Sequence, residues 1–243
     1  DRVRKSLELQ ALERALAARL ARTPYILLLS LPGVNIVSAA DCAGEFGPIR
    51  FYPNGRAITG RAGLYPSRYQ SDRVDRADGP LVKRGNRALR AVLLGVADNL
   101  LMCNRYFRTL AASWKAAKHD PRLIHTRVAM RFARIAFHIV AGRQVFQHPA
   151  TRERGYVLEK LIAFHRDHDT PMTQVLADLE AAVTQLPSTA HADEAAPLAR
   201  ELDKIRSGRR RGPQPIGDIL LAALARLGAM TVQSEASGGA TPA

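Results

Sequence analysis

The apolar positions of this chain recur with the period of α-helices over most of its 243 residues. In the opening stretch, apolar residues recur at spacings of three and four with charged residues between them, at Leu9, Leu12, Leu16 and Leu20. This pattern predicts an amphipathic helix over residues 1–23, of the type that forms the end of a coiled coil. A helix that packs singly on the surface of a monomer is the alternative, and the sequence leaves both open.

A tight turn is predicted after this helix. Pro24 interrupts the first pattern, and residues 26–31 run apolar into Pro32-Gly33-Val34-Asn35, before a helix rich in small residues. This order is typical of a helix-hairpin-helix, in which N–H groups at the start of the second helix bind a DNA phosphate without reading bases. We expect Asn35 to adopt the left-handed backbone of the second glycine in the common form. An ordinary helical turn within a core is the alternative.

Two longer helices are predicted next. Asn86 is a candidate N-cap for an apolar helix over residues 87–102. Over residues 122–145 the apolar set again has helical spacing, and a flanking stripe of the same helix carries Arg127, Arg131 and Arg134. We expect one stripe of this helix to pack and its neighbour to meet phosphate or solvent.

The rest of the chain predicts a helical extension over residues 149–232, with a break near Pro171, and a disordered tail over 233–243. No segment shows the convincing alternation of a strand, so the predicted fold class is mainly α. The chain therefore divides into a first helix over 1–23, a domain over 24–148, the extension and the tail.

Composition adds a polyanionic partner to this picture. The formal net charge is +14 and the sequence pI is about 10.6. Because neutralising phosphates releases counterions and drives association, nucleic acid is the first partner to consider. A basic, solvated surface without such a partner is the alternative.

Several other classes of protein are disfavoured. No apolar run approaches the roughly 18–20 residues that span a bilayer, and the start Asp1-Arg2-Val3-Arg4 has no signal-peptide pattern. We therefore expect a cytoplasmic protein with no membrane partner. Cys42 and Cys103 lack CxxC spacing and are predicted to be small buried residues. Residues 165–169 contain two histidines but no third ligand at typical spacing, so no metal site is predicted there.

The segment from Gly63 to Arg90, GLYPSRYQSDRVDRADGPLVKRGNRALR, carries the candidate chemistry. It places Ser67 and Ser71 in a turn-rich stretch among arginines, directly before a helix N-terminus. That arrangement suits an anionic ligand. From the residues alone neither serine is preferred, and both could simply hydrogen-bond a turn.

This segment, with LLLSLPGVNIVSAADCAGEFG upstream and VAMRFARIAFHIVAGRQVF downstream, resembles the C-terminal transposase domain of insertion-sequence transposases that use a bridge RNA. That family pairs a RuvC-like domain with a serine-bearing domain. The resemblance extends from about Tyr25 to Phe146. Its most specific pieces are Pro32-Gly33, Gly63-Leu64-Tyr65-Pro66, Ser71, Lys83-Arg84-Gly85-Asn86 and Leu89-Arg90.

The resemblance implies that Ser71 is the nucleophile that cleaves and rejoins DNA through a phosphoester. It also implies a coiled coil before the domain, a guide RNA and a homo-oligomer acting on DNA ends. One departure is that Asp72 stands where the family has glycine, followed by Asp75 and Asp78. These acids could pair with arginines, help hold a metal or cap turns.

The predicted nucleic-acid-binding residues are two turn residues and the cations around Ser71 and along the later helix. They are Gly33, Asn35, Arg68, Arg73, Arg76, Lys83, Arg84, Arg87, Arg90, Arg127, Arg131 and Arg134. Trp114, Tyr106 and Phe107 either stack on bases or belong to the core.

The resemblance also implies divalent metal, Mg²⁺, held by acidic residues of the RuvC-like domain. This chain begins after the point where that domain would end, and Asp41, Glu45 and Asp98 form no recognisable two-metal set. We therefore expect no cofactor in this chain, and activity only with the acidic domain supplied in trans.

The predicted function is that of a DNA transposase or recombinase domain of an insertion sequence. A non-catalytic DNA- or RNA-binding fragment of a transposase is the main alternative. A helical module whose basic surface contacts acidic proteins is a third possibility.

Overall fold

The computed structural model describes residues 1–67, 69–71, 74–76, 81–82, 84–148 and 156–187, and for 69–71 and 74–76 it describes the backbone. The chain forms two compact units. Unit 1 contains Asp1–Ile26 and the chain from Tyr156 onward, and unit 2 contains Leu27–Gly155. The segments predicted beyond residue 187, including the tail at 233–243, lie outside the described residues.

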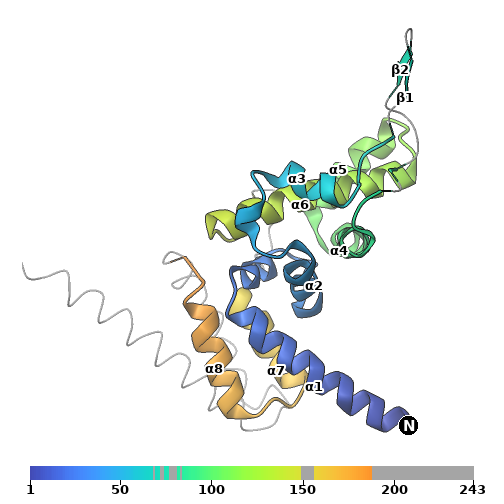
Figure 1. Cartoon of the computed structure of the whole chain (residues 1–243). Helices are drawn as coiled ribbons and strands as arrows, with labels where there is room; N and C mark the ends of the chain where they lie inside the picture. Colours follow the sequence, from blue (N-terminus) through green and yellow to red (C-terminus); the bar gives the residue numbers. More distant parts are fainter. Residues whose placement is uncertain (68, 72–73, 77–80, 83, 149–155, 188–243) are drawn as a thin grey trace, which may run out of the picture. The chain divides into compact units, whose positions relative to one another are not determined.

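The described structure is mainly helical, as predicted (Figure 1). After a 3-10 helix, η1, at Pro24–Ser30, unit 2 contains α2 (Ile36–Phe46), η2 (Ile49–Phe51), α3 (Gly55–Arg61), β1 (Tyr69–Ser71), β2 (Val74–Arg76), α4 (Arg87–Cys103), α5 (Arg105–Ala116) and α6 (Pro121–Gly142). Unit 1 contains α1 (Arg2–Ala21), α7 (Val157–Asp167) and α8 (Met172–Val183).

Four successive helices of unit 2 begin at an asparagine. The side chains of Asn35, Asn54, Asn86 and Asn104 accept hydrogen bonds from backbone N–H groups in the first turns of α2, α3, α4 and α5. An N-cap supplies a partner for an N–H group that the helix itself cannot satisfy, and each contributes about 1 kcal/mol. The predicted N-cap at Asn86 is confirmed.

The core of unit 2 forms where α4 crosses α6. Leu89 and Leu93 of α4 and Val128 and Phe132 of α6 have no exposed surface, as the helical spacing predicted. Helix α3 packs closely on α6 at Gly55, because a Cβ atom at that position would lie 2.6 Å from the Cα of Arg134. This close approach fixes the helix that precedes the serine segment.

One cysteine prediction is wrong. Cys42 is buried, and burial raises the pKa of its thiol. Cys103, the last residue of α4, is exposed because the next residue, Asn104, takes the inward position. The Asn104 amide nitrogen donates to the carbonyl of Pro32 at 3.1 Å.

The turn after η1 differs from the predicted one. Gly33 has a positive φ of 96° and lies against α4, where a Cβ atom would be 3.0 Å from the Asn99 carbonyl oxygen. Asn35, expected in the left-handed region, is extended, with φ −109° and ψ 178°. The reason is a capping box: Ser38 N–H donates to Asn35 Oδ1 at 2.8 Å, and Asn35 N–H donates to Ser38 Oγ at 3.0 Å.

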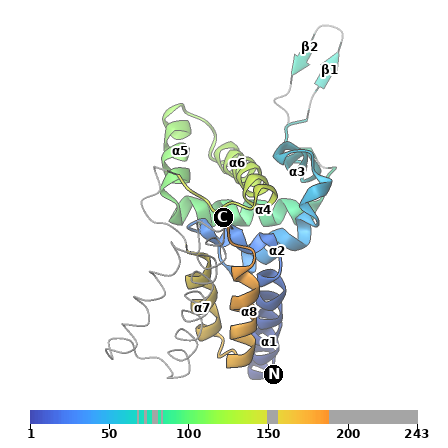
Figure 2. The same ribbon diagram turned by 90° about the vertical axis from the view of Figure 1, so that its left-hand side faces the viewer.

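The serine segment contains the two strands that the sequence did not predict. β1 and β2 pair antiparallel, with Tyr69 opposite Arg76, Gln70 opposite Asp75 and Ser71 opposite Val74. In Figure 2 they stand away from the helices of unit 2. Each strand has three residues, which is too few to show an apolar–polar alternation.

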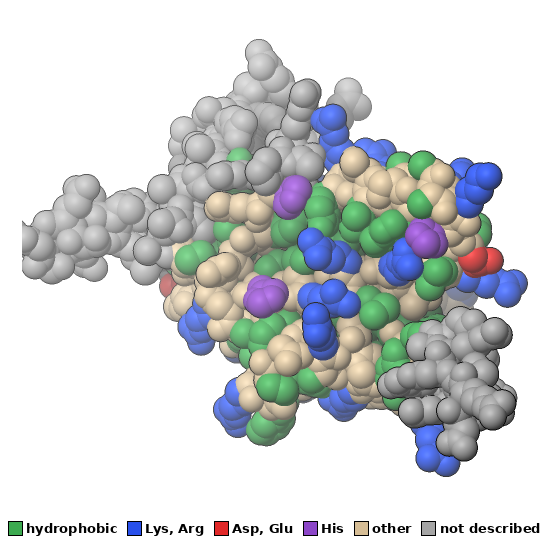
Figure 3. Space-filling view, turned by 90° about the horizontal axis from the view of Figure 1, so that it is seen from above, with side chains coloured by type: hydrophobic (Ala, Val, Ile, Leu, Met, Phe, Trp, Pro, Cys, Tyr) green, Lys and Arg blue, Asp and Glu red, His purple; other side chains and the backbone are tan. Residues whose placement is uncertain are grey.

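Basic residues dominate the second half of unit 2. Between residues 105 and 148 the chain has nine Lys or Arg residues and one acidic residue, Asp120. The Asp120 carboxylate caps α6, accepting from the N–H of Arg122 at 2.7 Å. On the face drawn in Figure 3, Lys, Arg and His side chains lie among hydrophobic ones and acidic side chains are few.

In unit 1, α8 packs against both α1 and α7. The predicted first helix is present, but its buried positions are Ala17, Leu20 and Ala21. Leu9 and Leu12 are 55% and 68% exposed, so the coiled-coil pairing stays a prediction. The predicted break near Pro171 is confirmed, since α7 ends at Asp167 and α8 begins at Met172. No helix within the described residues has the length and apolarity needed to cross a membrane.

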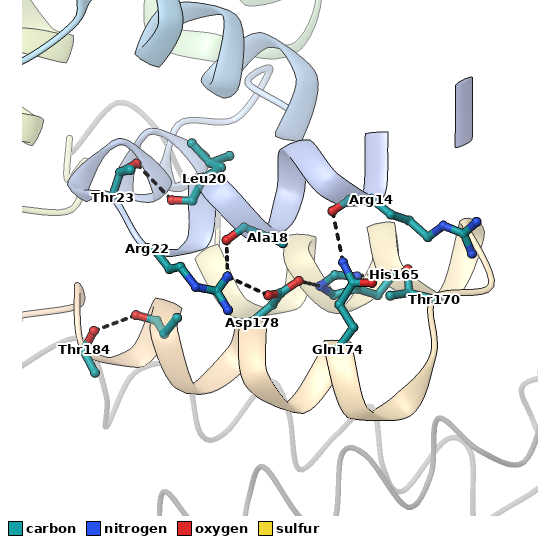
Figure 4. Close-up of polar contacts among 11 residues, drawn as sticks. Arg14, Ala18, Leu20, Arg22, Thr23, His165, Thr170, Gln174, Asp178 and Thr184 are labelled. Carbon is teal, nitrogen blue, oxygen red and sulfur yellow. Dashed lines mark hydrogen bonds and ion pairs between the residues drawn. The ribbon is translucent and has the colours of Figure 1, made fainter. Parts of the chain in front are cut away.

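A buried polar cluster joins the three helices of unit 1 (Figure 4). Asp178 Oδ1 accepts from Arg22 Nη1 at 3.0 Å, and Asp178 Oδ2 lies 3.6 Å from His165 Nε2. His165 Nδ1 lies within hydrogen-bond distance of the Thr170 hydroxyl, at 3.1 Å. The other histidine of the 165–169 segment, His168, instead contacts Glu13 at 2.8 Å.

This cluster predicts that unit 1 loses stability in mild acid. Burial, with a smaller contribution from the nearby His168, lowers the pKa of His165 from 6.5 to about 4. Between those values the unfolded chain binds a proton that the folded chain excludes, so stability falls as pH falls. The loss reaches about 2 kcal/mol at pH 5. Urea unfolding followed by circular dichroism at pH 7.5 and 5 measures it, with Trp114 fluorescence reporting on unit 2.

The control is His165→Gln, which removes the contribution of His165 to the pH dependence of stability. Burial also raises the pKa of Asp178, a change that Arg22 opposes and that has the reverse effect on stability. The difference between wild type and His165→Gln isolates the histidine from this effect. An equal loss of stability in both proteins would contradict the assignment.

Candidate nucleic-acid site at the base of the serine hairpin

The two candidate serines lie at opposite ends of one hairpin, residues 66–81, here called the serine hairpin. Ser71 is the last residue of β1 and pairs with Val74, the first residue of β2, so it lies at the turn end. Ser67 precedes β1 next to the bridge between Pro66 and Leu81, at the other end. The backbone therefore separates the residue that the resemblance favours from its alternative.

The chain enters and leaves the serine hairpin through closely packed backbone. Val82 N–H donates to the Tyr65 carbonyl at 3.1 Å. Gly63 has a φ of 65°, and a Cβ atom there would lie 2.8 Å from the Arg84 carbonyl oxygen. Gly85 has a φ of 150°, and its Cβ would lie 3.0 Å from the Gly63 nitrogen. Side chains at Gly63 and Gly85 would force apart the two backbone segments that meet here.

Arg90 joins the two sides of this base. Its Nε donates to the Ala62 carbonyl at 2.8 Å, and its Nη2 donates to the Val82 carbonyl at 2.6 Å. One guanidinium thus bridges the segment before the hairpin and the segment after it. Because two of its nitrogens are bonded inside the protein, we leave Arg90 out of the phosphate-binding set proposed below.

Asn86 connects the base to α2 and α3. Besides capping α4, its side-chain nitrogen donates to Glu45 Oε2 at 3.0 Å. Its backbone N–H donates to the carbonyl of Arg61 at 2.8 Å. We define the hairpin base as Arg61–Tyr65, Val82, Arg84–Asn86 and Arg90.

A second arginine anchors the end of α3. Arg61 donates to the Phe46 carbonyl at 3.3 Å and to the Tyr52 hydroxyl. The Tyr52 hydroxyl also donates to the Phe46 carbonyl, at 2.9 Å. The ends of α2 and α3 are therefore tied to each other next to the hairpin base.

The acidic residues near the base do not form a metal site. Asp41 lies one turn before Glu45 on α2, and its pKa is raised by burial and by the Glu45 charge. Asp98 is paired with His125 at 2.9 Å. Across the described part of the chain, no group of three or more His, Cys, Asp or Glu side chains could hold a metal ion. The resemblance assigns the metal-binding acids to the RuvC-like domain and not to Asp41, Glu45 or Asp98.

The predicted phosphate-binding cations fall on two parts of unit 2. Arg84 and Arg87 are exposed at the start of α4, next to the hairpin base. Arg127 and Arg131 lie on α6 with Arg134, whose Nε is buried without a hydrogen-bond partner among the described residues. Arg76 lies in β2. The predicted residues that lie outside the described residues are Arg68, Arg73 and Lys83.

Two arginines of α6 lie over aromatic rings of α5, a contact that was not predicted from the sequence. The guanidinium carbon of Arg127 lies 5.7 Å from the Trp114 ring centroid, and that of Arg131 lies 6.0 Å from the Tyr106 ring centroid. Arg131 Nε also donates to the Tyr106 hydroxyl at 2.8 Å. Phe107 is fully buried, so the core alternative holds for this ring.

A family model matches part of the chain. Residues 25–112 match the model of the transposase IS116/IS110/IS902 family. These residues resemble an insertion-sequence transposase domain. The match contains the complete hairpin base and α4, and it ends within α5.

A curated transposase is also similar. The chain is 26% identical over 143 residues to the transposase for insertion sequence element IS1328 of Yersinia enterocolitica. The similar region covers 57% of this chain and 42% of the relative. The chain therefore spans less than half the length of this relative.

The geometry of the base predicts that Gly63→Ala destabilises unit 2. Alanine in the left-handed region costs about 1–2 kcal/mol, and its Cβ would also displace the Arg84 carbonyl or Arg90. Urea unfolding followed by the fluorescence of Trp114, which lies in unit 2, measures the loss.

Gly95→Ala is the matched control. Gly95 lies within α4, and a Cβ atom there meets nothing within 4 Å. This substitution should stabilise the helix by about 0.5–1 kcal/mol. If both alanine variants shift stability in the same direction, the close packing of the base is refuted.

Proposed function

We propose that this chain is a DNA-joining part of an insertion-sequence transposase, with Ser71 as its nucleophile. The observation that carries the proposal is the convergence of motif residues at the hairpin base. Gly63, Gly85, Asn86 and Arg90 belong to the pieces on which the resemblance rests, and all four hold the two ends of the segment that presents Ser71. The family match over residues 25–112 supports the same function.

The proposed chemistry is a transesterification. The Ser71 oxygen forms a bond to a DNA phosphorus as the bond to one sugar oxygen breaks. The serine proton passes to a base, and the departing sugar oxygen takes up a proton. A new strand end then displaces the serine by the reverse reaction. The phosphodiester energy is conserved in the serine phosphoester, so rejoining needs no nucleotide cofactor.

Cations next to the hairpin base hold the phosphates. Arg84 and Arg87 are exposed where α4 begins, and the helix N-terminus adds partial positive charge there. Arg68, Arg73, Arg76 and Lys83 lie in the same segment of sequence. Arg84 and Arg87 lie at the opposite end of the hairpin from Ser71 and hold phosphates farther along the strand. Arg73 and Arg76, which follow Ser71 closely in sequence, supply the positive charge that stabilises the transition state at the reacting phosphorus.

Other predicted contacts lie farther along the chain. Arg127, Arg131 and Arg134 on α6 extend the positive surface. At the turn before α2, the N–H groups of Asn35 and Ser38 are already bonded to each other's side chains. A phosphate at this helix-hairpin-helix-like turn therefore contacts the other N–H groups of the first turn of α2.

The proposed machinery has three further parts. Acidic residues of a RuvC-like domain bind divalent metal, and a guide RNA directs the complex to its DNA. Self-association through α1 brings DNA ends together. The exposed apolar side chains of Val3, Leu7, Leu9 and Leu12 support that role for α1.

The second candidate function is a non-catalytic nucleic-acid-binding fragment of a transposase. The observation that favours it is the exposure of Arg84 and Arg87 next to the hairpin base, which suits nucleic-acid binding whether or not Ser71 reacts. The two functions share the basic surface and differ only in the chemistry of Ser71.

A suicide substrate separates the two candidates. Nicked DNA that loses a short strand after cleavage traps a covalent protein–DNA adduct, which denaturing gel electrophoresis detects. With Mg²⁺ and a RuvC-like domain added as a separate polypeptide, we expect an adduct from the wild-type chain and from Ser67→Ala. Ser71→Ala should form none, a loss of more than about 100-fold. An adduct that persists in Ser71→Ala would refute the nucleophile.

Salt dependence tests the proposed phosphate contacts. The affinity for duplex DNA should fall log-linearly with salt concentration, and Arg84→Gln with Arg87→Gln should lower the slope by about two. Arg4→Gln with Arg19→Gln removes the same charge from α1 and should leave the slope unchanged. Fluorescence anisotropy of labelled DNA provides the affinities. Equal binding to polyglutamate at the same salt would instead favour the acidic-protein partner.

A further inference from the structure

We propose that the α5–α6 hairpin binds an unpaired DNA strand by stacking its bases on Trp114 and Tyr106. The inference rests on the proposed function in one respect, namely that DNA is the polymer handled. It adds a binding surface that lies largely outside the matched residues 25–112 and that needs no contribution from Ser71.

The first argument is the position of the rings. Tyr106 and Trp114 are only half-buried, whereas the neighbouring Phe107 is fully buried in the core. Each partly exposed ring is next to an arginine of α6, at 6.0 Å for Tyr106 and 5.7 Å for Trp114. A ring with an adjacent guanidinium offers a base a stacking surface and offers its phosphate a cation.

The second argument is that Tyr106 is part of a larger aromatic group. Its ring centroid lies 4.2 Å from that of His148, and the rings of His148 and Phe146 are nearly parallel, with an interplanar angle of 10°. A base of any sequence can stack on an outer ring of such a cluster, because every base has a π-face.

Charge supplies the third argument. Residues 105–148 have nine Lys or Arg residues, and their one acidic residue, Asp120, is engaged as the N-cap of α6. A phosphate chain lying along this hairpin therefore meets positive charge with little compensating negative charge.

The geometry favours an unpaired strand over a duplex. Tyr106 and Trp114 are eight residues apart on α5, about 12 Å along its axis. In a duplex, the bases over that distance point toward the helix axis and pair with one another, so only their edges reach a protein side chain. Rings can stack on bases only when the strand is unpaired.

The test uses the only tryptophan of the chain, Trp114. The complete 243-residue chain is titrated with oligo-dT of 12 nucleotides, with a 12-base-pair dA·dT duplex and with oligo-U of the same length. We expect oligo-dT to quench Trp114 emission and the duplex to leave it nearly unchanged. Unchanged emission at saturating oligo-dT would overturn the proposal.

Variants give a second readout by anisotropy. Trp114→Ala should weaken oligo-dT binding roughly 5- to 100-fold, the loss expected for one stacked base, and should change duplex binding less than about twofold. Trp114→Phe should recover most of the affinity. Arg127→Gln should weaken oligo-dT binding, and Arg4→Gln, its charge control, should match the wild type. Circular dichroism establishes that each variant is folded.

The remaining outcomes are also decisive. An equal loss of single-strand and duplex affinity in Trp114→Ala would overturn the stacking role, and an oligo-U affinity more than tenfold above that of oligo-dT would overturn the choice of DNA. Ser71→Ala should bind oligo-dT like the wild type. Failure of the serine chemistry and failure of this surface are therefore distinguishable.

Discussion

The arrangement of the candidate site depends on one guanidinium. Arg90 bonds the carbonyls of Ala62 and Val82, which belong to the segments that enter and leave the serine hairpin. Two three-residue strands are too short to be stable alone. Their pairing therefore depends on the base, where Gly63 and Gly85 allow backbone to meet backbone and Arg90 holds the contact. Hydrogen bonds of this charged kind contribute about 1.5–3 kcal/mol each.

The arginines of this basic chain serve two different purposes. Arg22, Arg61 and Arg90 are bonded to carboxylate or carbonyl oxygens inside their units. Arg84 and Arg87 are exposed. The net charge of +14 therefore overstates the charge that is placed for a ligand, and the internal arginines determine where the exposed ones lie. A half-buried arginine bonded to two segments, such as Arg90, fixes their geometry more narrowly than apolar contact does, because its planar fork has fixed donor directions.

The sequence predicted the features that depend on neighbouring residues. The helical spacing of apolar residues over 87–102 and 122–145 predicted the helices that pack together. Asn86 was identified as a cap because capping acts over three residues. Asn35 was assigned the wrong backbone, although Ser38 three residues later was a signal for a capping box. The base could not be predicted, because Arg90 bonds carbonyls 8 and 28 residues away. No local pattern distinguishes such an arginine from one that binds phosphate.

The serine hairpin also acts as a lever. The last residue of β1, Ser71, lies about 7 Å beyond its first residue, Tyr69, at 3.4 Å per residue. A tilt of about 8° in this pair of strands therefore moves the backbone at Ser71 by about 1 Å relative to Tyr69. Any reaction carried out by Ser71 would lose about 100-fold in rate through a displacement of this size. The rigidity of the hairpin base is thus a property on which the turn end of the hairpin depends.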